Sequence, residues 1–365
     1  MRTLLAWEGR SLAPVVCWVL LMAGPGVAHA GVPADFIGLT AEDVSIGDSD
    51  YRATAWREQK EAGAGIVRIT FDWTQIEPEA DSYDFTAYDE EVAAAAENGM
   101  RVLPVLANPP RFWERRPAGS HRRGTYPPDP GAMARFAAAL VGRYGPDGTL
   151  FAERPELRRV PIRSWQIWNE PNLPVYWLPR PNPRRYVGLL RTVGSAIHAA
   201  DPRAEVVSAG LPESRSGMSF ARFVKGMYRA GGRGAFDTFA VHPYARTERG
   251  VVGAVRLARK LARRHGDRRR RVWVTEIGWS SSGPRSPFKA GPRGQAKRIR
   301  ATLKALARRR KRLRVRGVVY YNWRDYPFNV ARGRDFFGLH TGLLRADGSR
   351  KFAYYAFAHT ARDLR

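Results

Sequence analysis

The chain of 365 residues is long enough for one large α/β barrel or two smaller domains, and its hydrophobic fraction of 44% excludes a disordered chain. Its formal net charge is +27, from 61 basic and 34 acidic residues, and only eight of the basic residues are lysine. No zinc-ligand spacing, RNA-recognition aromatic motif or glycine-rich phosphate loop is present, so we expect no nucleic-acid partner despite the charge.

The first thirty residues have the pattern of a secretory signal. Arg2 and Arg10 give a basic start, an apolar stretch begins at Val15, and Ala28-His29-Ala30 forms a small-x-small cleavage site. The apolar stretch is short for a membrane span, although an uncleaved amphipathic anchor is the alternative. We therefore expect a signal peptide at residues 1–30, cleavage near Ala30, and a secreted or cell-envelope protein with no stable membrane span.

Residues 31–365 are expected to form a single catalytic domain without disulfides. The only cysteine, Cys17, lies inside the expected signal, so the exported chain has no thiol. No composition break or Ser/Pro-rich linker divides the rest of the chain. Stability must then come from one apolar core.

Apolar runs of strand length alternate with helical patterns from one end of the chain to the other. The expected strands lie near residues 36–39, 65–71, 101–106, 163–168, 204–209, 236–241, 271–275 and 315–321. The expected helices lie near residues 86–98, 130–143, 183–200, 219–230, 251–264, 295–311 and 353–361, and Thr86-x-x-Asp89 has the pattern of a capping box for the first of them. The strands are mostly continuous apolar runs, as in a parallel sheet that helices cover on one or both faces.

Eight such units over about 330 residues favour an α/β fold of the single (β/α)8 TIM-barrel type over an open doubly wound sheet. The longest irregular stretches are residues 108–129, 171–182, 280–292 and 323–350. They follow the third, fourth, seventh and eighth strands, so in a barrel they all lie on the C-terminal face, where sites are built.

The arginines are densest at residues 263–271 and 308–316, where helical patterns give way to strands. Cations at helix C-termini are favoured by the helix dipole and usually form a solvated face. A dedicated polyanion site is the alternative, and it would allow association with an anionic cell envelope.

Two carboxylates follow expected strands at positions suited to one shared site. Trp165-Gln166-Ile167-Trp168 leads into Asn169-Glu170-Pro171, and the seventh strand leads into Glu276. In a barrel both glutamates would project into the same mouth. Two converging carboxylates are what glycoside hydrolysis requires, because one protonates the leaving oxygen while the other attacks or assists at the anomeric carbon.

Because Asn169 and Glu170 follow the fourth expected strand and Glu276 the seventh, the chain resembles a clan A retaining glycoside hydrolase, similar to families 5 and 39. The resemblance covers residues 33–365 and includes Arg68, the Trp73-Thr74-Gln75-Ile76-Glu77-Pro78 run, Val241-His242-Pro243-Tyr244, and Trp323 after the eighth strand. One departure is that family 5 enzymes generally place a histidine near the end of strand 3. This chain has Ala107-Asn108-Pro109-Pro110 there, and the nearest histidine is His121.

The resemblance implies a role for each site residue. Glu170 would be the acid/base and Glu276 the nucleophile, with Arg68 beside Glu276 to keep it ionised. Asn169 would bind the substrate 2-hydroxyl, Tyr244 would orient Glu276, and His242 would bridge within the site. Trp279 and Trp323 would be sugar-stacking platforms, and Trp113, Tyr126, Tyr176 and Trp177 are weaker candidates for outer subsites.

Each assignment has a structural alternative that the sequence leaves open. Arg68 could form a barrel-interior ion pair, Asn169 could bind its own turn, and His242 could be a satisfied core histidine. At about 5 to 5.5 Å two carboxylates repel by roughly 3 kcal/mol at an effective dielectric near 20, which is about two pKa units. One of the two glutamates would then stay protonated near neutrality.

The leading function is a secreted glycosidase that acts on a poly- or oligosaccharide, without cofactor or metal, as a monomer. We expect no metal site because the seven histidines are scattered along the chain and form no cluster at ligand spacing. The alternatives are a catalytically inactive carbohydrate-binding barrel and a basic polyanion-binding protein of the cell envelope.

Overall fold

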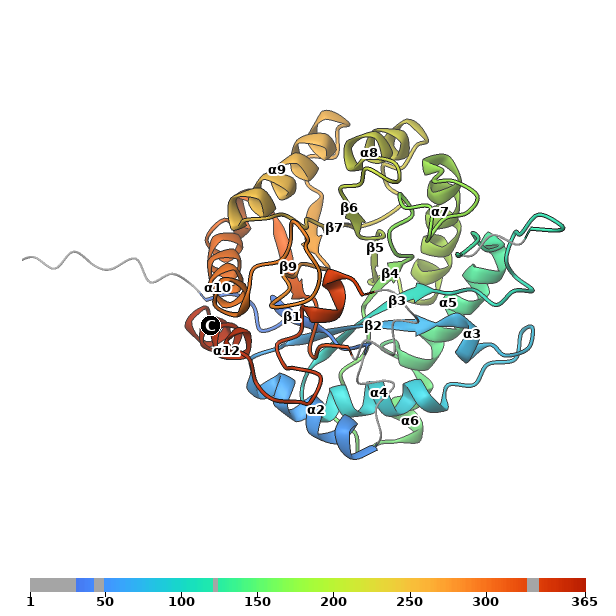
Figure 1. Ribbon diagram of the computed structural model, residues 1–365. Coiled ribbons are helices and arrows are strands. Elements are labelled where there is room, and N and C mark those ends of the chain that lie inside the picture. Colours follow the sequence, from blue (N-terminus) through green and yellow to red (C-terminus); the bar gives the residue numbers. More distant parts are fainter. Residues whose placement is uncertain (1–30, 43–48, 121–123, 327–334) are drawn as a thin grey trace, which may run out of the picture. The chain divides into compact units, whose positions relative to one another are not determined.

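Eight parallel strands close into a barrel in the computed structural model, as the sequence predicts. The strands are β1 (Ile37–Thr40), β2 (Ile66–Asp72), β3 (Arg101–Ala107), β4 (Ser164–Ile167), β5 (Glu205–Val207), β7 (Thr238–His242), β8 (Arg271–Val274) and β9 (Val315–Tyr320). They pair in the order β5-β4-β3-β2-β1-β9-β8-β7, and a β5–β7 pairing at Val207 and Thr238 closes the ring. Figure 1 looks along the barrel, with the strands at the centre and the helices around them.

The structure describes residues 31–42, 49–120, 124–326 and 335–365. The expected signal peptide with Cys17, and His121, lie outside these residues. Residues 32–365 form one compact unit. Within the described ranges, no helix is both long and apolar enough to cross a bilayer.

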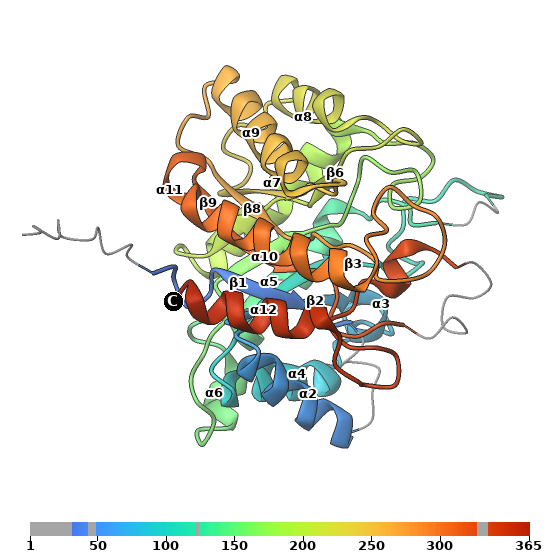
Figure 2. The same ribbon diagram turned by 60° about the vertical axis from the view of Figure 1, so that its left-hand side comes forward.

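Helices follow the strands and cover the outside of the barrel (Figures 1 and 2). They are α2 (Ser49–Glu61), α3 (Trp73–Ile76), α4 (Thr86–Glu97), α5 (Pro130–Tyr144), α6 (Thr149–Glu153), α7 (Pro183–Ala200), α8 (Phe220–Arg229), α9 (Glu248–Arg264), α10 (Pro292–Arg308), α11 (Arg310–Leu313) and α12 (Phe352–Asp363). The 3-10 helix η2 (Phe337–His340) belongs to the long loop after β9 and lies over the centre of the barrel in Figure 1. Several begin at clear sequence signals. Asp129 accepts a hydrogen bond from the backbone N–H of Ala132 just before Pro130 opens α5, and Asn182 caps α7 in the same way before Pro183.

The predicted capping box at Thr86 and Asp89 is wrong. α4 begins one residue earlier than a Thr86 cap requires, with Phe85 as the cap residue, and Asp84 accepts the hydrogen bond from the Thr86 N–H. Asp89 instead forms an ion pair of 2.5 Å with Arg143 on α5. A tertiary partner has therefore replaced the local one.

The sequence also left several short elements unassigned, namely α2, α3, α6, α11, η2 and the two-residue strand β6 (Leu211–Pro212). Only a few positions of α2 are buried, including Ala55, Trp56 and Gln59, so its apolar periodicity is weak. The other elements have five residues or fewer, which is too short for a periodic signal.

The core is rich in tryptophan. Eight tryptophans are less than 2% exposed: Trp56, Trp73, Trp165, Trp168, Trp177, Trp273, Trp279 and Trp323. A buried aromatic side chain removes on the order of 150–250 Å² from water, which contributes about 4–6 kcal/mol at 25 cal/mol per Å² as an upper estimate. This burial holds a fold whose only cysteine, Cys17, lies before the barrel.

Candidate active site

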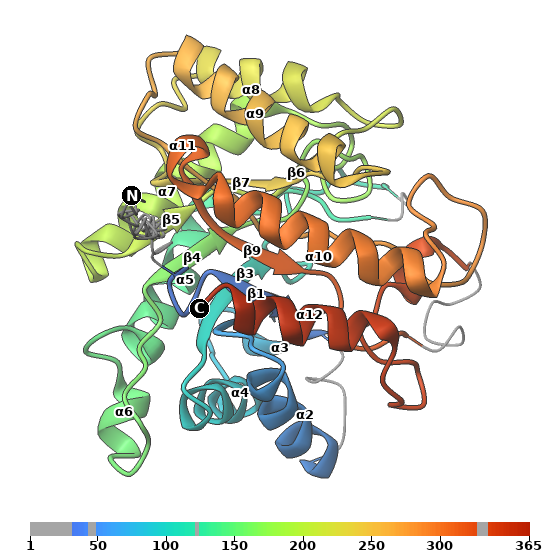
Figure 3. The ribbon, with the colours of Figure 1, turned by 90° about the vertical axis from the view of Figure 1, so that its left-hand side faces the viewer.

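A pocket of about 350 Å³ opens at the C-terminal ends of the barrel strands. Residues from β2, from the segments after β3 and β4, and from the loops after β7, β8 and β9 line it, so it lies where the barrel topology predicts a site. Figure 3 shows the barrel from the side, with the long loops after β8 and β9 at the end opposite α11. Glu170, Glu276, Arg68, Asn169 and Tyr244 all line this pocket.

Glu170 and Glu276 face each other across the pocket. One side-chain oxygen of each lies within 4.8 Å of the other, and both residues are only 9% exposed. The two residues are far apart in the chain, but β4 and β8 carry them to the same mouth. A carboxylate pair this close fits a retaining geometry, whereas inverting pairs stand about 6.5–9.5 Å apart to leave room for a water.

Arg68 is fixed by three contacts at the base of the pocket. Its guanidinium lies 2.8 Å from Oε1 of Glu276, and it donates hydrogen bonds to Oδ1 of Asn169 at 3.0 Å and to Oε1 of Gln166 at 3.2 Å. Register places Arg68 beside Thr40 of β1 and Leu103 of β3, inside the closed sheet. The ion pair with Glu276 is the contact that the family resemblance implies.

The amide of Asn169 is oriented by Arg68 rather than by its own turn. Its oxygen accepts from Arg68, and its Nδ2 has no hydrogen-bond partner among the residues the structure describes, so the amide N–H groups remain available to donate in the pocket that Asn169 lines. The backbone around it is strained: Trp168 has φ 73° and Glu170 has φ 45°. Left-handed conformations of this kind in non-glycine residues often mark functional sites, and here they place both side chains in the pocket.

His242, the last residue of β7, and Tyr244, two residues after it, form hydrogen bonds with Glu170 and Glu276. The Tyr244 hydroxyl donates to Oε2 of Glu276 at 2.9 Å. His242 is fully buried, and its Nδ1 lies 2.7 Å from Oε1 of Glu170 and 3.6 Å from Oε2 of Glu276, while its Nε2 contacts the Thr275 hydroxyl at 3.1 Å. The histidine therefore bridges the two glutamates as the resemblance implies.

Gly210 makes room for this histidine. A Cβ atom at Gly210 would lie 1.9 Å from Nε2 of His242. The Gly210 carbonyl also accepts a hydrogen bond from the Glu170 N–H at 3.2 Å. Any side chain at this position would displace the imidazole from its bridging position.

The surroundings of the two glutamates push their pKa values apart. Burial raises the pKa of Glu170, and the nearby charge of Glu276 adds to this rise, although the hydrogen bond with His242 opposes it. Burial alone would raise the pKa of Glu276 too, but the positive charges of His242 and Arg68 and the hydrogen bonds from Tyr244 and Arg68 outweigh burial and lower it. Two carboxyls with opposite shifts are suited to the roles of acid and nucleophile.

One of the two carboxyl oxygens of Glu170 is free of protein partners among the described residues. Oε1 of Glu170 is occupied by His242, whereas its Oε2 has no partner within the described part of the chain. In Glu276, Arg68 binds Oε1 and Tyr244 binds Oε2, which fixes the plane of that carboxylate.

The structure does not support the sugar-stacking role predicted for Trp279 and Trp323. Both are 0% exposed and neither lines the pocket. Trp279 donates its indole N–H to the Ala245 carbonyl, and Trp323 packs against Tyr354 in the core. Among the weaker candidates, Tyr176 lines the pocket, Tyr126 and Trp177 are buried, and the Trp113 indole donates to Glu77.

Other aromatic side chains line the pocket in their place. Tyr321 directly follows β9, and Phe336 and Phe337 come from the loop after it. The sequence signal for Tyr321 was present, since it is the last apolar residue of the eighth expected strand. The apolar pattern includes Tyr321 in the strand, and the resemblance implies Trp323 as the sugar-stacking residue after it.

A third carboxylate, Glu42, was also missed. It follows β1, lines the pocket, and accepts hydrogen bonds from the Thr70 N–H at 3.2 Å and from the Thr70 hydroxyl at 2.8 Å. Burial raises its pKa, and the charge of Arg68 opposes this. The available signal was its position just after the first strand, equivalent to that of Glu170 and Glu276 after theirs.

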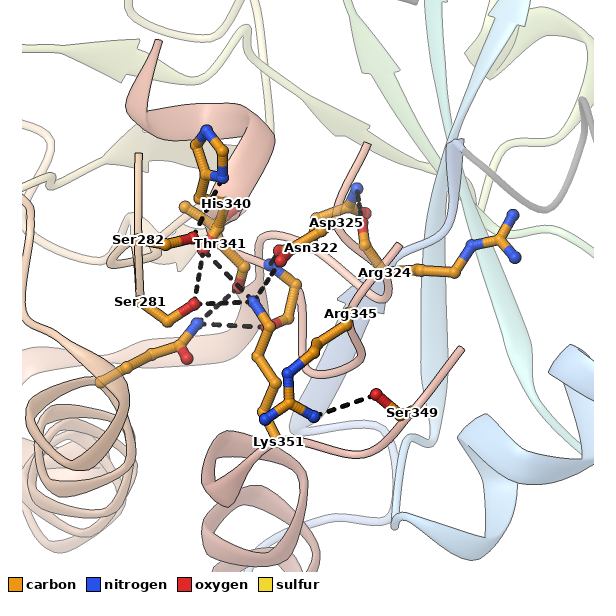
Figure 4. A network of polar contacts seen from close by, with 12 residues as sticks. Ser281, Ser282, Asn322, Arg324, Asp325, His340, Thr341, Arg345, Ser349 and Lys351 are labelled. Atoms are coloured by element: carbon orange, nitrogen blue, oxygen red, sulfur yellow. Dashed lines mark hydrogen bonds and ion pairs between the residues drawn. The ribbon is translucent and has the colours of Figure 1, made fainter. Parts of the chain in front are cut away.

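A buried polar network behind the pocket fixes the loop that carries Phe337 (Figure 4). Lys351 lies 2.5 Å from Asp325 and donates to the Ser281 hydroxyl at 2.9 Å. Asp325 accepts from the Gly342 N–H at 2.8 Å. The network thus joins the loop after β8 to both ends of the long loop after β9.

Glu170, His242 and Glu276 also have the composition of a metal-ligand set, with one ligand atom from each within 4.8 Å of the others. Two features make the set a poor cation site. Arg68 already lies 2.8 Å from Glu276 and supplies positive charge there, and both ring nitrogens of His242 already have partners. The arrangement fits acid/base and nucleophilic chemistry better.

The comparisons with known proteins agree with this geometry at the level of fold. A family model described as beta-galactosidase of glycoside hydrolase family 42 matches residues 47–119, which include Arg68 but neither Glu170 nor Glu276. No curated protein matches the chain by sequence.

Several of the solved structures that the chain resembles are glycoside hydrolases. A family 39 enzyme from Bacteroides cellulosilyticus matches with a TM-score of 0.64 and 23% identity over 90% of this chain and 63% of its own. A monomeric beta-xylosidase from Caulobacter crescentus gives 0.65 and 19%, over 91% and 69%, and a family 5 enzyme from Bifidobacterium longum gives 0.63 and 16%, over 90% and 79%. The chain spans less than two thirds of the Bacteroides protein. It shares the (β/α)8 barrel fold of these glycoside hydrolases, and this is the fold that the sequence resemblance implies.

Proposed function

We propose that the protein is a retaining glycoside hydrolase that cleaves O-glycosidic bonds of a poly- or oligosaccharide by double displacement. The observation that carries this proposal is the pair Glu170 and Glu276, whose oxygens lie within 4.8 Å of each other in a shared pocket and whose pKa values shift in opposite directions. Many folds of this class host unrelated functions, so the argument rests on the site and not on the barrel.

In the first step Glu276 attacks the anomeric carbon. Its carboxylate forms a glycosyl ester while Glu170 gives its proton to the departing oxygen, which leaves as an alcohol. Arg68 and Tyr244 keep Glu276 ionised and oriented before the attack. Asn169 donates to the sugar 2-hydroxyl through its unpaired Nδ2.

In the second step Glu170, now ionised, removes a proton from an incoming water. The water oxygen attacks the anomeric carbon, the ester bond to Glu276 breaks, and the sugar is released with its original anomeric configuration. His242 serves both steps, because its contact with Glu170 persists while the charge moves between the two glutamates.

The test is a screen of aryl glycosides and purified cell-envelope polysaccharides with Glu276→Gln, Glu170→Gln and the exposed Glu97→Gln as a matched control. We expect Glu276→Gln to remove turnover, Glu170→Gln to keep some turnover on substrates with good leaving groups, and Glu97→Gln to behave as the parent protein. Undiminished activity in both pocket variants would contradict the proposal. So would an NMR measurement showing that the released sugar has the inverted anomeric configuration.

The inactive carbohydrate-binding barrel is less well supported. A binding protein needs neither the paired carboxylates nor the Arg68 and Tyr244 contacts that fix Glu276. Binding of a glycan without any turnover, unchanged in Glu276→Gln, would favour it.

We also propose that the enzyme is exported and acts as a monomer. Export is supported by the pattern of residues 1–30, and the monomer by the likeness to a beta-xylosidase that is described as monomeric. Detection of the mature protein beginning near Gly31 outside the cell, and a mass measured in solution, test these points.

A further inference from the structure

Two strongly basic segments lie side by side at the end of the barrel away from the pocket. Residues 256–271 contain nine cations and one carboxylate, and residues 308–316 contain seven cations and no carboxylate. The short helix α11 places the second segment against the first, where Arg314 donates a hydrogen bond of 2.8 Å to the Arg269 carbonyl. Figure 3 shows α11 opposite the loops that surround the pocket.

A hollow of about 540 Å³ lies between α9 and α11, and its lining is almost wholly cationic. Six exposed cations line it: Arg256, Lys260, Arg263, Arg264, Arg268 and Arg312. Leu313 and the buried Arg259 complete the wall, and no carboxylate contributes to it.

The positive charge in this hollow is not neutralised by the protein. None of the six exposed cations has an ion-pair partner within 4.0 Å in the described ranges of the chain. Asp267, the carboxylate in these segments, is committed to Arg270 at 2.8 Å and to the Tyr228 hydroxyl. The guanidinium of Arg259 donates hydrogen bonds to the Arg268 and Arg270 carbonyls.

Helix dipoles account for only part of this arrangement. Arg263 and Arg264 lie in the last turn of α9, where a cation is favoured. Arg256 and Lys260 lie one to two turns earlier, and Arg312 comes from another helix, so no dipole gathers them here. Burial, and after it the neighbouring charges of Arg314 and Arg263, lower the pKa of Arg259.

The chemistry of the lining identifies the kind of ligand. Arginine forks bind phosphate oxygens in pairs, and several cations along one hollow fit several charges spaced along a chain. The lining contains no aromatic face on which a base could stack. We propose that this hollow is a binding site for a linear polymer of phosphate groups, recognised by its charge.

Binding there leaves the pocket at the other end of the barrel open. The site would hold the protein on a phosphate-bearing polymer while the pocket stays accessible to carbohydrate. The inference does not depend on the proposed hydrolase activity, because it rests on residues that the pocket does not use.

The test compares two triple variants that remove the same charges from neighbouring helices. Arg256→Gln, Lys260→Gln and Arg263→Gln remove three of the six exposed cations of the hollow, whereas Arg222→Gln, Lys225→Gln and Arg229→Gln remove two arginines and one lysine from the exposed face of α8. Binding of long-chain inorganic polyphosphate to the whole chain is measured by calorimetry at several NaCl concentrations. Equal melting temperatures of the variants and the parent establish that both are folded.

We expect the hollow variant to bind polyphosphate at least tenfold more weakly than the parent at about 0.1 M salt, with a salt dependence shallower by roughly two to three units. The α8 variant should stay within about twofold of the parent. Equal losses in the two variants would overturn the proposal, since they would show a general charge effect. Double-stranded DNA that binds more tightly than polyphosphate, with that binding lost in the hollow variant, would also overturn it and identify a nucleic-acid site.

Discussion

The guanidinium of Arg68 lies 2.8 Å from Oε1 of Glu276, and the same side chain holds the amide of Asn169 at 3.0 Å. One buried cation thus sets both the charge of the proposed nucleophile and the direction of the group that would bind the sugar beside it. The ion pair is almost fully screened from water, with Arg68 2% exposed. Its electrostatic influence is therefore far larger than that of a surface pair.

We predict that Arg68→Met raises the pKa of Glu276 and moves the acid limb of the pH–rate profile upward. The positive charge that favours the ionised carboxylate is lost, while burial, which favours the neutral form, remains. We expect kcat/KM to fall about 100-fold near neutral pH, mostly through kcat. Arg68→Lys keeps the charge and should leave the acid limb close to that of the parent; a shift equal to that of Arg68→Met would contradict the electrostatic explanation.

The opposite shifts of the two glutamates predict a bell-shaped dependence of kcat/KM on pH. Glu276 must be ionised, so activity is lost as pH falls through its pKa, which lies below the ordinary value of 4.5. Glu170 must be protonated for the first step, so activity is lost as pH rises through its pKa, which lies above 4.5. Glu170→Gln, assayed on an activated aryl glycoside, should lose the alkaline limb and keep the acid limb. An alkaline limb that survives in this variant would assign it to another group.

The barrel could be predicted because eight short continuous apolar runs alternate along the chain with helical patterns, and each of these signals is local. Only the helix after the first strand, α2, has too weak an apolar periodicity to be predicted. What failed was also local. Thr86 and Asp89 have the spacing of a capping box, but Arg143 on a helix far along the chain takes Asp89 as its partner. The four residues of a capping-box pattern contain no information about an ion pair with a distant helix.

The site was predictable where a residue directly follows a strand, because the topology alone then sets its direction. Glu170 and Glu276 are of this kind. Trp279 lies further into its loop, five residues after β8, and there the packing of distant segments decides which face is exposed. Trp323 is as close to β9 as Glu170 is to β4, three residues, yet its side chain packs inward against Tyr354, so the distance from the strand end alone does not fix the direction. Glu42 and Tyr321 do follow their strands directly, and the same rule would have found them.

Glu42 should determine which sugar the pocket accepts. Its carboxylate is oriented by two hydrogen bonds from Thr70, and a carboxylate that binds a hydroxyl contributes on the order of 1.5–3 kcal/mol. We predict that Glu42→Gln lowers kcat/KM for the preferred substrate about 10- to 100-fold. Deoxy analogues lacking single hydroxyls identify the group it binds, because the variant and the parent should differ little on that analogue. Equal losses on every analogue would mean that Glu42 acts on the fold or on Glu276 rather than on the sugar.

The ion pair between Lys351 and Asp325 should be important for both stability and the shape of the pocket. Lys351 is 4% exposed, and burial lowers its pKa while it raises that of Asp325, so the pair depends on its own attraction and hydrogen bonds to stay charged. We predict that Lys351→Met lowers the free energy of unfolding by about 3 kcal/mol, measured by chemical denaturation, because it leaves a buried carboxylate without its partner.

Two controls separate this effect from general loss of a lysine. Lys304→Met breaks a more exposed ion pair of 3.0 Å with Asp363 and should cost less than about 1 kcal/mol. Adding Asp325→Asn to Lys351→Met should restore part of the loss in the free energy of unfolding, since the unpaired charge is removed, although Gly342 then loses its carboxylate acceptor.

Because the network holds the loop that carries Phe337, Lys351→Met should also raise KM more than it lowers kcat. Equal destabilisation by Lys351→Met and Lys304→Met would show that the buried pair has no special weight in this fold.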